Sequence, residues 1–180
     1  MYPDPFVVHF LSLLPSPQGS TVLDAGCGAG RNARYLAGAG LRVTAIDRSV
    51  GMVRRARAEG VPAGIATIEH LPFVAGAFDA AVCTSVLEYL DAPTAQAAVA
   101  EVQRVLRPGG RLLVVAAAAE GSEPGYGAGR HDATVARLTE RDDLTAWFDQ
   151  CDTLERLHVH LEVPASPPVR AQWVLIARRR

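Results

Sequence analysis

Short apolar runs alternate with stretches of helical periodicity through the first two thirds of the chain. Continuous apolar runs of roughly four to eight residues are typical of strands buried on both faces of a parallel sheet, whereas apolar positions recurring about every 3.6 residues indicate helices. The pattern predicts strands at residues 21–24, 41–47, 64–68, 78–84 and 111–117. It predicts helices at residues 5–14, 31–39 and 94–106, and one after the helix-capping Ser49. This alternation favours an α/β fold with crossover helices.

The last third of the chain has a different pattern. Residues 120–132 contain four glycines and a proline among polar residues, which predicts an exposed loop. Thr139, with Asp142 three residues later, resembles a capping box that opens a helix to about residue 150. Apolar runs at 154–163 and 170–178 are separated by a short proline-rich link. Two strands with so short a connection should form an antiparallel hairpin.

Composition places the chain among globular domains and limits its partners. Its 180 residues are 49% hydrophobic and 21% charged, which predicts one domain with a buried core. A formal net charge of -1 argues against bulk electrostatic binding to nucleic acid or to an anionic membrane. The sequence shows neither an apolar run of membrane-spanning length nor an export signal, so we expect a cytoplasmic protein that does not insert into membranes.

The cysteines carry no sign of a metal centre. Cys27, Cys83 and Cys151 lie far apart in the sequence, without a CxxC pair or clustered histidines. This spacing predicts reduced thiols and no metal site.

Glycines occupy every second position where the first predicted strand meets the first crossover helix, at Gly26, Gly28 and Gly30. Glycine permits the positive φ values and the close backbone approach that a nucleotide ligand needs at such a turn. A tight turn without a ligand is one alternative. A nicotinamide dinucleotide site is another, because Gly28, Gly30 and Ala33 satisfy the pattern G-x-G-x-x-G/A.

Acidic residues at the ends of the first two strands distinguish these ligands. Asp24 precedes the glycine loop, where its negative charge would oppose a pyrophosphate bound at the helix N-terminus. S-adenosylmethionine has no phosphate, and its ammonium and sulfonium groups match the charge of Asp24. Asp47, at the end of the second strand, is placed to bind ribose hydroxyls in either nucleotide class. The charges therefore favour S-adenosylmethionine.

Five motifs in order resemble the class I S-adenosylmethionine-dependent methyltransferases, most closely the small-molecule branch of methyltransferase type 11 that includes quinone-biosynthesis enzymes. The motifs are Leu23-Asp24-Ala25-Gly26-Cys27-Gly28-Ala29-Gly30, Ala45-Ile46-Asp47-Arg48-Ser49 with Met52, Glu69-His70-Leu71-Pro72-Phe73, Phe78-Asp79-Ala80-Ala81-Val82 and Val105-Leu106-Arg107-Pro108-Gly109-Gly110-Arg111. They cover residues 20 to about 119. Gly30-Arg31-Asn32 followed by Leu36-Ala37 is also similar to the tellurite-resistance type of methyltransferase.

The resemblance implies a Rossmann-like, doubly wound, seven-stranded sheet of order 3-2-1-4-5-7-6 with strand 7 antiparallel. It divides a single domain, residues 1–180, into an N-terminal helix (1–19), a cofactor-binding core (20–119) and an acceptor-side loop, helix and terminal hairpin (120–180). The antiparallel seventh strand agrees with the terminal hairpin predicted above.

The resemblance also assigns cofactor-binding residues. Asp24 and the glycine loop would hold the methionine portion of S-adenosylmethionine, and Asp47 the ribose. The other expected contacts are Gly26, Cys27, Gly28 and Gly30 in the loop, Arg48 and Met52 beside the adenine, and Cys83 at the end of the fourth strand. Thr67 stands where the family usually carries an acid that accepts from the adenine amino group, while the Ile68 amide can donate to the adenine ring.

The function expected from these residues is methyl transfer to a small-molecule acceptor. His131 is the candidate for positioning or deprotonating the acceptor, and a solvated loop histidine is the alternative. Glu88 and Tyr89 either reach the acceptor or cap and pack the following helix. We expect the acceptor site between residues 120–132, the end of the fourth strand and the N-terminal helix. A catalytically silent methyltransferase-like module that binds a partner, and a nicotinamide-dependent oxidoreductase, are the competing functions.

Overall fold

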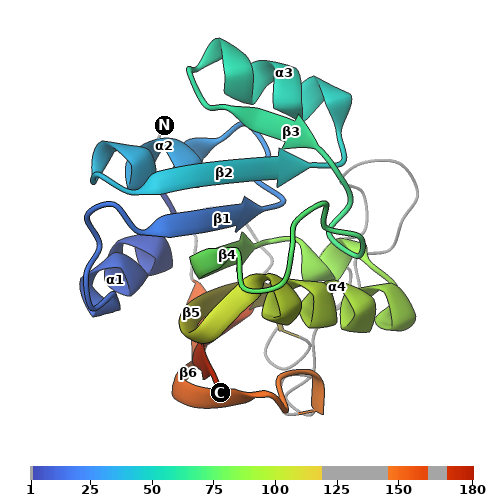
Figure 1. The fold of residues 1–180 in the computed structure, drawn as a ribbon. Coiled ribbons are helices and arrows are strands. Elements are labelled where there is room, and N and C mark those ends of the chain that lie inside the picture. Colours follow the sequence, from blue (N-terminus) through green and yellow to red (C-terminus); the bar gives the residue numbers. More distant parts are fainter. Residues whose placement is uncertain (1, 119–145, 162–169) are drawn as a thin grey trace.

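The strands described by the computed structural model form one seven-stranded sheet of order β3-β2-β1-β4-β5-β7-β6 (Figure 1). The structure describes residues 2–118, 146–161 and 170–180. The strands are β1 (Thr21–Ala25), β2 (Arg42–Asp47), β3 (Ala63–Ile65), β4 (Phe78–Thr84), β5 (Leu106–Ala117), β6 (Cys151–Leu161) and β7 (Arg170–Arg179). The helices are α1 (Pro5–Leu13), α2 (Arg31–Gly38), α3 (Val50–Ala58), the short 3₁₀ helix η1 (Leu87–Tyr89) and α4 (Ala92–Val105).

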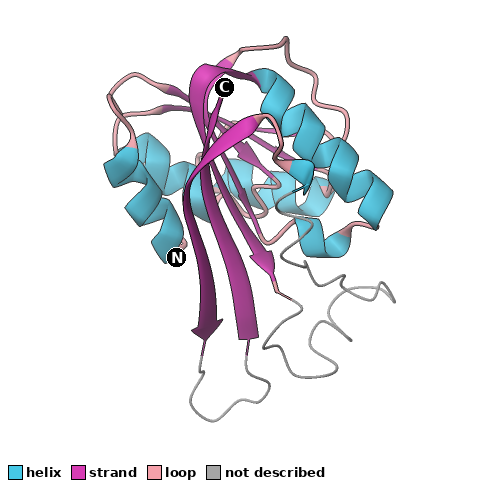
Figure 2. Cartoon of the chain, turned by 90° about the horizontal axis from the view of Figure 1, so that it is seen from below, coloured by secondary structure: helices cyan, strands magenta, loops and turns pink. Residues whose placement is uncertain are grey.

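Helices cover both faces of the sheet, as Figure 2 shows. On one face, α1 and α2 bury Phe10 and Leu36 against Val22 of β1 and its neighbours, and α3 continues this layer over β2. On the other face, α4 packs against β4 and β5 through residues such as Val99. Strands covered in this way are apolar on both sides, which explains the continuous apolar runs in the sequence.

The predicted α/β class and strand order are confirmed. Strands β1 to β5 are parallel, whereas β7 is antiparallel to both β5 and β6. Within the described residues, none of the helices has the length and apolar character needed to cross a membrane.

Several element boundaries differ from those predicted. Strand β3 is shorter and earlier than residues 64–68, and β6 begins at Cys151 rather than 154. Strand β5 begins at Leu106, directly after α4, because Leu106 pairs with Phe78 before a register shift that accommodates Pro108-Gly109-Gly110. Of the helix predicted to reach residue 150, Ala146 and Trp147 are helical, and the part before residue 146 lies outside the described residues.

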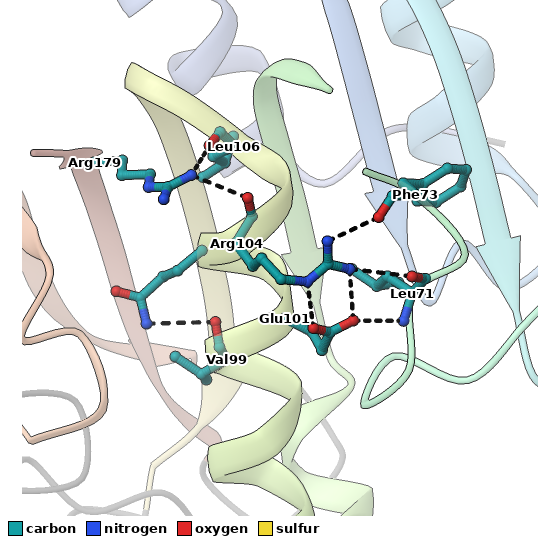
Figure 3. Close-up of polar contacts among 8 residues, drawn as sticks. Leu71, Phe73, Val99, Glu101, Arg104, Leu106 and Arg179 are labelled. Atoms are coloured by element: carbon teal, nitrogen blue, oxygen red, sulfur yellow. Dashed lines mark hydrogen bonds and ion pairs between the residues drawn. The ribbon is translucent and has the colours of Figure 1, made fainter. Parts of the chain in front are cut away.

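A cluster of polar contacts fixes the C-terminal end of α4 (Figure 3). The Arg104 guanidinium contacts Glu101 at 2.5 Å and donates to the backbone oxygens of Phe73 at 2.8 Å and Leu71 at 3.2 Å. Glu101 also accepts from the Leu71 N–H at 2.8 Å. Arg179 of β7 donates to the backbone oxygens of Arg104 and Leu106. The cluster therefore ties the segment after β3 to the helix, and the helix to β7.

Candidate functional site

A cleft of about 270 Å³ lies at the carboxyl ends of the parallel strands, where open α/β sheets bind ligands. Six residues predicted to bind the cofactor line it: Gly26, Gly28, Asp47, Arg48, Met52 and Ile68. The remaining lining residues are Ile46, Ala66, Glu69, Ser85, Val86, Tyr89 and Leu90. The cleft is thus built from the turns after β1, β2, β3 and β4.

The glycine loop combines ligand access with close packing. Gly26, Gly28 and Gly30 have φ values of 79°, 54° and 81°. A Cβ added at Gly26 would lie 2.3 Å from Val86, whereas one added at Gly30 would lie 2.8 Å from Val61. Gly26 therefore allows the turn after β4 to approach the loop, and Gly30 lets the loop pack against the end of α3.

Asp47 connects the glycine loop to α3. Its Oδ2 accepts from the Gly28 N–H, and its Oδ1 accepts from the Ser49 N–H, both at 2.8 Å. Each carboxylate oxygen has a further lone pair, so hydroxyl groups in the cleft can still donate to it. The arrangement suits a ribose beside the end of β2.

Asp24 is buried in β1, and one of its carboxyl oxygens has no hydrogen-bond partner. Its side chain is 1% exposed, and the unpaired oxygen is Oδ2. Burial raises the pKa of Asp24 to about 7, while a hydrogen bond from the Ala33 N–H and the charge of Arg31 oppose the shift and the charge of Asp47 adds to it. A buried carboxylate with an unpaired oxygen is costly, and a cationic ligand would supply the missing partner.

Other predicted contacts lie outside the cleft lining. Cys27 packs in the cluster beneath α3, and burial raises the pKa of its thiol to about 12. Cys83 lies in the core on the α4 side, and burial raises the pKa of its thiol as well, so both cysteines are neutral at physiological pH. Thr67 is exposed between two lining residues. His131 lies outside the described residues.

A buried network joins the N-terminus to the carboxyl edge of the sheet. Asn32 accepts from the Asp4 N–H and donates to the Thr84 hydroxyl, each at 2.9 Å. The start of α1 is therefore anchored beside the start of α2 and the end of β4. This is the edge at which the N-terminal helix was expected to contribute.

Sequence reasoning missed part of the cleft wall. Glu69 and Leu90 line the cleft, and the contacts of Glu101 and Arg104 hold the segment that carries Glu69. The three-residue spacing of Glu101 and Arg104 on a helix was the available signal for their ion pair, but it does not show that Arg104 also reaches two backbone oxygens after β3. Within the described residues, His, Cys, Asp and Glu side chains form no group suited to a metal ion.

Comparisons with known proteins agree with this architecture. The family described as "Methyltransferase domain" matches residues 23–114. The chain is 33% identical over 118 residues to the ubiquinone biosynthesis O-methyltransferase of Xanthomonas axonopodis pv. citri, covering 62% of this chain and 48% of that protein. It is 38% identical over 116 residues to the malonyl-[acyl-carrier protein] O-methyltransferase of Pectobacterium atrosepticum, covering 63% and 45%. The chain thus spans about half the length of these relatives.

Solved structures share the fold. An S-adenosylmethionine-dependent methyltransferase from Methanosarcina mazei superposes with a TM-score of 0.79 at 22% identity, covering 99% of each chain. TehB from Haemophilus influenzae superposes with a TM-score of 0.79 at 19% identity, covering 98% of this chain and 62% of that one.

Fold and cleft together define a Rossmann-like domain of the class I methyltransferase type. The chain belongs to the methyltransferase-domain family, whose match extends from β1 into β5, and its cofactor is S-adenosylmethionine. The residues of the site fit S-adenosylmethionine. The unpaired, buried oxygen of Asp24 can pair with a cationic group, and the carboxylate of Asp47 can accept further hydrogen bonds at the cleft.

Proposed function

We propose that this domain transfers a methyl group from S-adenosylmethionine to an oxygen atom of a small-molecule acceptor. The observation that carries the proposal is the buried, unpaired Asp24 oxygen beside a glycine loop, which suits a ligand with a positive charge and no phosphate. The O-methyltransferase names of two relatives support an oxygen atom as the methyl acceptor.

Each part of the cleft has a role in this proposal. Asp24 holds the ammonium group, with Gly26, Cys27, Gly28 and Gly30 shaping the loop around the methionine portion. Asp47 binds the ribose hydroxyls. Arg48, Met52, Thr67 and Ile68 surround the adenine, and Cys83 supports the methyl-transfer region from the core.

When bound, S-adenosylmethionine supplies an activated methyl group whose transfer leaves a neutral thioether. The protein's main task is therefore to align the acceptor, and positioning of this kind can contribute roughly 7 to 11 kcal/mol to lowering a barrier. The turn carrying Ser85 and Val86 comes within van der Waals reach of the glycine loop, which closes one side of the cleft. His131 stays a proposal as a positioning group or base.

The proposal includes a single domain over residues 1–180, with an N-terminal helix (1–19), a cofactor-binding core (20–119) and an acceptor-side region (120–180). We propose that this domain acts in the cytoplasm. Its acceptor is a small molecule and not a nucleic acid. A net charge of -1 supports this partner class.

Calorimetry with S-adenosylhomocysteine and with NADH tests the ligand. We expect binding of the first and none of the second. Incubation with radiolabelled S-adenosylmethionine and a small-molecule extract, followed by mass spectrometry, should reveal a methylated product. Asp24→Asn should weaken the binding of S-adenosylhomocysteine strongly and lower product formation, and Asp152→Asn, an exposed surface change, should affect neither. Tight NADH binding without a response to S-adenosylhomocysteine would contradict the proposal, and cofactor binding without any product would favour a silent module.

A further inference from the structure

Arginine side chains gather where the start of α2 lies beside the end of α3. Residues 26–62 contain seven arginines and two acidic residues, although the whole chain has a formal net charge of -1. Arg31 and Arg34 belong to α2, and three more arginines belong to α3. The two helix ends are close, because a Cβ added at Gly30 would lie 3.2 Å from the Cβ of Ala56. This part of the domain is therefore basic, unlike the chain as a whole.

A cavity of about 230 Å³ lies between these helix ends. Its lining residues are Ala29, Arg31, Arg34, Arg55, Ala58 and Glu59. None of them lines the cofactor cleft, although Ala29 is the next residue after Gly28, which does. The glycine loop thus contributes to both cavities, and the arginine-lined cavity is distinct from the place assigned to the cofactor.

The charges of this cavity favour an anion. Three guanidinium groups line it against a single carboxylate, that of Glu59, which contacts Arg34 at 2.7 Å. Asp4, which is not part of the lining, lies 3.5 Å from Arg31, a distance longer than is usual for a charge-assisted hydrogen bond. Within the part of the chain that the structure describes, Arg55 forms no ion pair. An anion in the cavity would therefore meet an excess of positive charge.

Among anions, a phosphate group suits three arginines best. The planar guanidinium donates parallel hydrogen bonds in a geometry that matches phosphate oxygens. A phosphate monoester offers three acceptor oxygens and close to two negative charges near neutral pH, whereas a carboxylate offers two oxygens and one charge. The arginines come from two helices, so they can reach different oxygens of one phosphate.

A second cavity, of about 370 Å³, lies next to the first along α2. Arg31 and Arg34 line both cavities, so their side chains form the shared wall. The other lining residues of the second cavity carry no charge: Pro3, Tyr35, Gly38 and Ala39. Tyr35 presents a partly buried ring there. A ligand that extends from the first cavity into the second would have a phosphate at one end and an apolar group at the other.

We propose that Arg31, Arg34 and Arg55 bind the phosphate group of a small phosphate ester other than the cofactor, and that the organic part of this ester lies in the second cavity against Tyr35. A cavity between two helix ends encloses a small ligand, whereas a nucleic acid follows an extended basic surface. The site does not depend on the proposed methyltransferase function.

Calorimetry of the full chain at about pH 8, where the phosphate is a dianion, and at near-physiological ionic strength tests the site. Phenyl phosphate is the probe, and inorganic phosphate supplies the phosphate group without the ring. Each is titrated with and without saturating S-adenosylhomocysteine. Arg55→Met removes one lining charge. Arg54→Met is the matched control, because Arg54 is also an exposed arginine of α3 but lines neither cavity.

Phenyl phosphate should bind at one site per chain and more tightly than inorganic phosphate. Its affinity should change less than about twofold when S-adenosylhomocysteine is present. Arg55→Met should weaken both phosphates about tenfold, because it removes charge-assisted hydrogen bonds, and Arg54→Met should stay within about twofold of the wild type. Tyr35→Leu should weaken phenyl phosphate and leave inorganic phosphate unchanged, which also shows that this variant is folded.

Several results would overturn the proposal. If neither phosphate binds, the cavity is not a site. Equal losses in Arg54→Met and Arg55→Met would show that only the overall charge of the face attracts anions. Displacement of phenyl phosphate by S-adenosylhomocysteine would place the probe in the cofactor cleft, and tighter binding of a single-stranded oligonucleotide would indicate a nucleic-acid surface instead. A chain that fails to bind S-adenosylhomocysteine but binds phenyl phosphate through Arg55 would contradict the proposed function and leave the phosphate site standing.

Discussion

The ends of β1 and β4 present the same chemical group in different backbone settings. Asp24 and Glu88 are both buried carboxyl groups with one unpartnered oxygen, and burial raises the pKa of each to about 7. Asp24 belongs to a strand paired on both sides and has the charge of Arg31 nearby. Glu88 belongs to a 3₁₀ turn that follows Ser85, a non-glycine residue with a φ of 56°.

The difference shows that an unpaired, buried carboxyl group can be held either by a regular strand or by a strained turn. Asp24 is held by a strand that pairs with β2 on one side and β4 on the other and that leads into the glycine loop. The turn after β4 is short and begins with a residue in the left-handed region, a conformation that persists only when its surroundings enforce it. Because Ser85 and Val86 of this turn also line the cleft, the conformation of the turn helps to set the shape of the cleft.

The largest expected effect is on stability as a function of pH. Both carboxyl groups have folded pKa values of about 7, against ordinary values of 3.8 and 4.5, so the folded protein binds more protons than the unfolded chain between these limits. Their stabilising contribution is complete below about pH 4 and is lost as the pH rises to about 7. For the two groups together we expect the free energy of unfolding to fall on the order of 3 kcal/mol between pH 5 and pH 7.

Urea denaturation of the ligand-free protein at several pH values measures this fall. The double variant Asp24→Asn/Glu88→Gln should show a much smaller fall, and each single variant an intermediate one. An identical pH dependence in the wild type and the double variant would show that neither group is protonated in the folded state.

The next effect is a difference between Asp24 and Glu88 in the binding of S-adenosylhomocysteine. Asp24→Asn removes the charge that pairs with the cofactor ammonium, a hydrogen bond to a charged group worth about 2–3 kcal/mol. The affinity for S-adenosylhomocysteine should therefore fall roughly 30- to 150-fold in calorimetry. Glu88→Gln should leave this affinity within about twofold of the wild type. Equal losses in both variants would contradict the assignment of the cofactor ammonium to Asp24.

A smaller effect is expected from the segment after β3, which Arg104 holds against α4. Arg104→Met removes the donors to the backbone oxygens of Leu71 and Phe73, which should destabilise the protein by about 2 kcal/mol and weaken cofactor binding a few-fold. Arg178→Met, which breaks an exposed ion pair with Asp152, is the control and should cost less than about 1 kcal/mol. Thermal unfolding measures both variants, and similar losses would mean that the contacts of Arg104 do not support the cleft wall.

The smallest expected effect is a gain in cofactor affinity from a substitution at residue 67. Thr67→Asp places a carboxylate between the lining residues Ala66 and Ile68, where it can accept from the adenine amino group better than a hydroxyl does. The affinity for S-adenosylhomocysteine should improve by about 1 kcal/mol. An unchanged affinity in a folded variant would indicate that residue 67 does not face the adenine, leaving Glu69 as the acid on that wall.

Local patterns predicted the fold better than the boundaries of its elements. The alternation of apolar runs and helical periods indicated the parallel sheet, and the resemblance gave its order. Pro108-Gly109-Gly110 indicated a break before the fifth strand, yet the structure includes them in β5. The reason is a long-range pairing of Leu106 with Phe78, which local propensity does not encode.

Part of the candidate site was also predictable from local sequence, and part depends on long-range packing. The glycine spacing and the acids at two strand ends pointed to Gly26, Gly28 and Asp47, because backbone conformation and charge are properties of a short segment. The loop sequence alone does not show that Cys27 and Gly30 pack toward α3 instead of lining the cleft. The unpaired atoms of Glu88 and Trp173 result from the packing of β4, β5 and β7, so no short sequence motif predicts them.

The contact between Arg179 and the end of α4 has a consequence for synthesis on the ribosome. The guanidinium of Arg179 reaches the backbone oxygens of Arg104 and Leu106 only when β7 lies beside β5 (Figure 3). A nascent chain that has emerged only as far as β5 can form β1 to β5, but the second edge of β5, with its buried leucines and valines, stays unpaired. An apolar strand with an open edge is a template for aggregation. We therefore expect the edge of β5 to be exposed to aggregation while the residues between β5 and β7 are being translated.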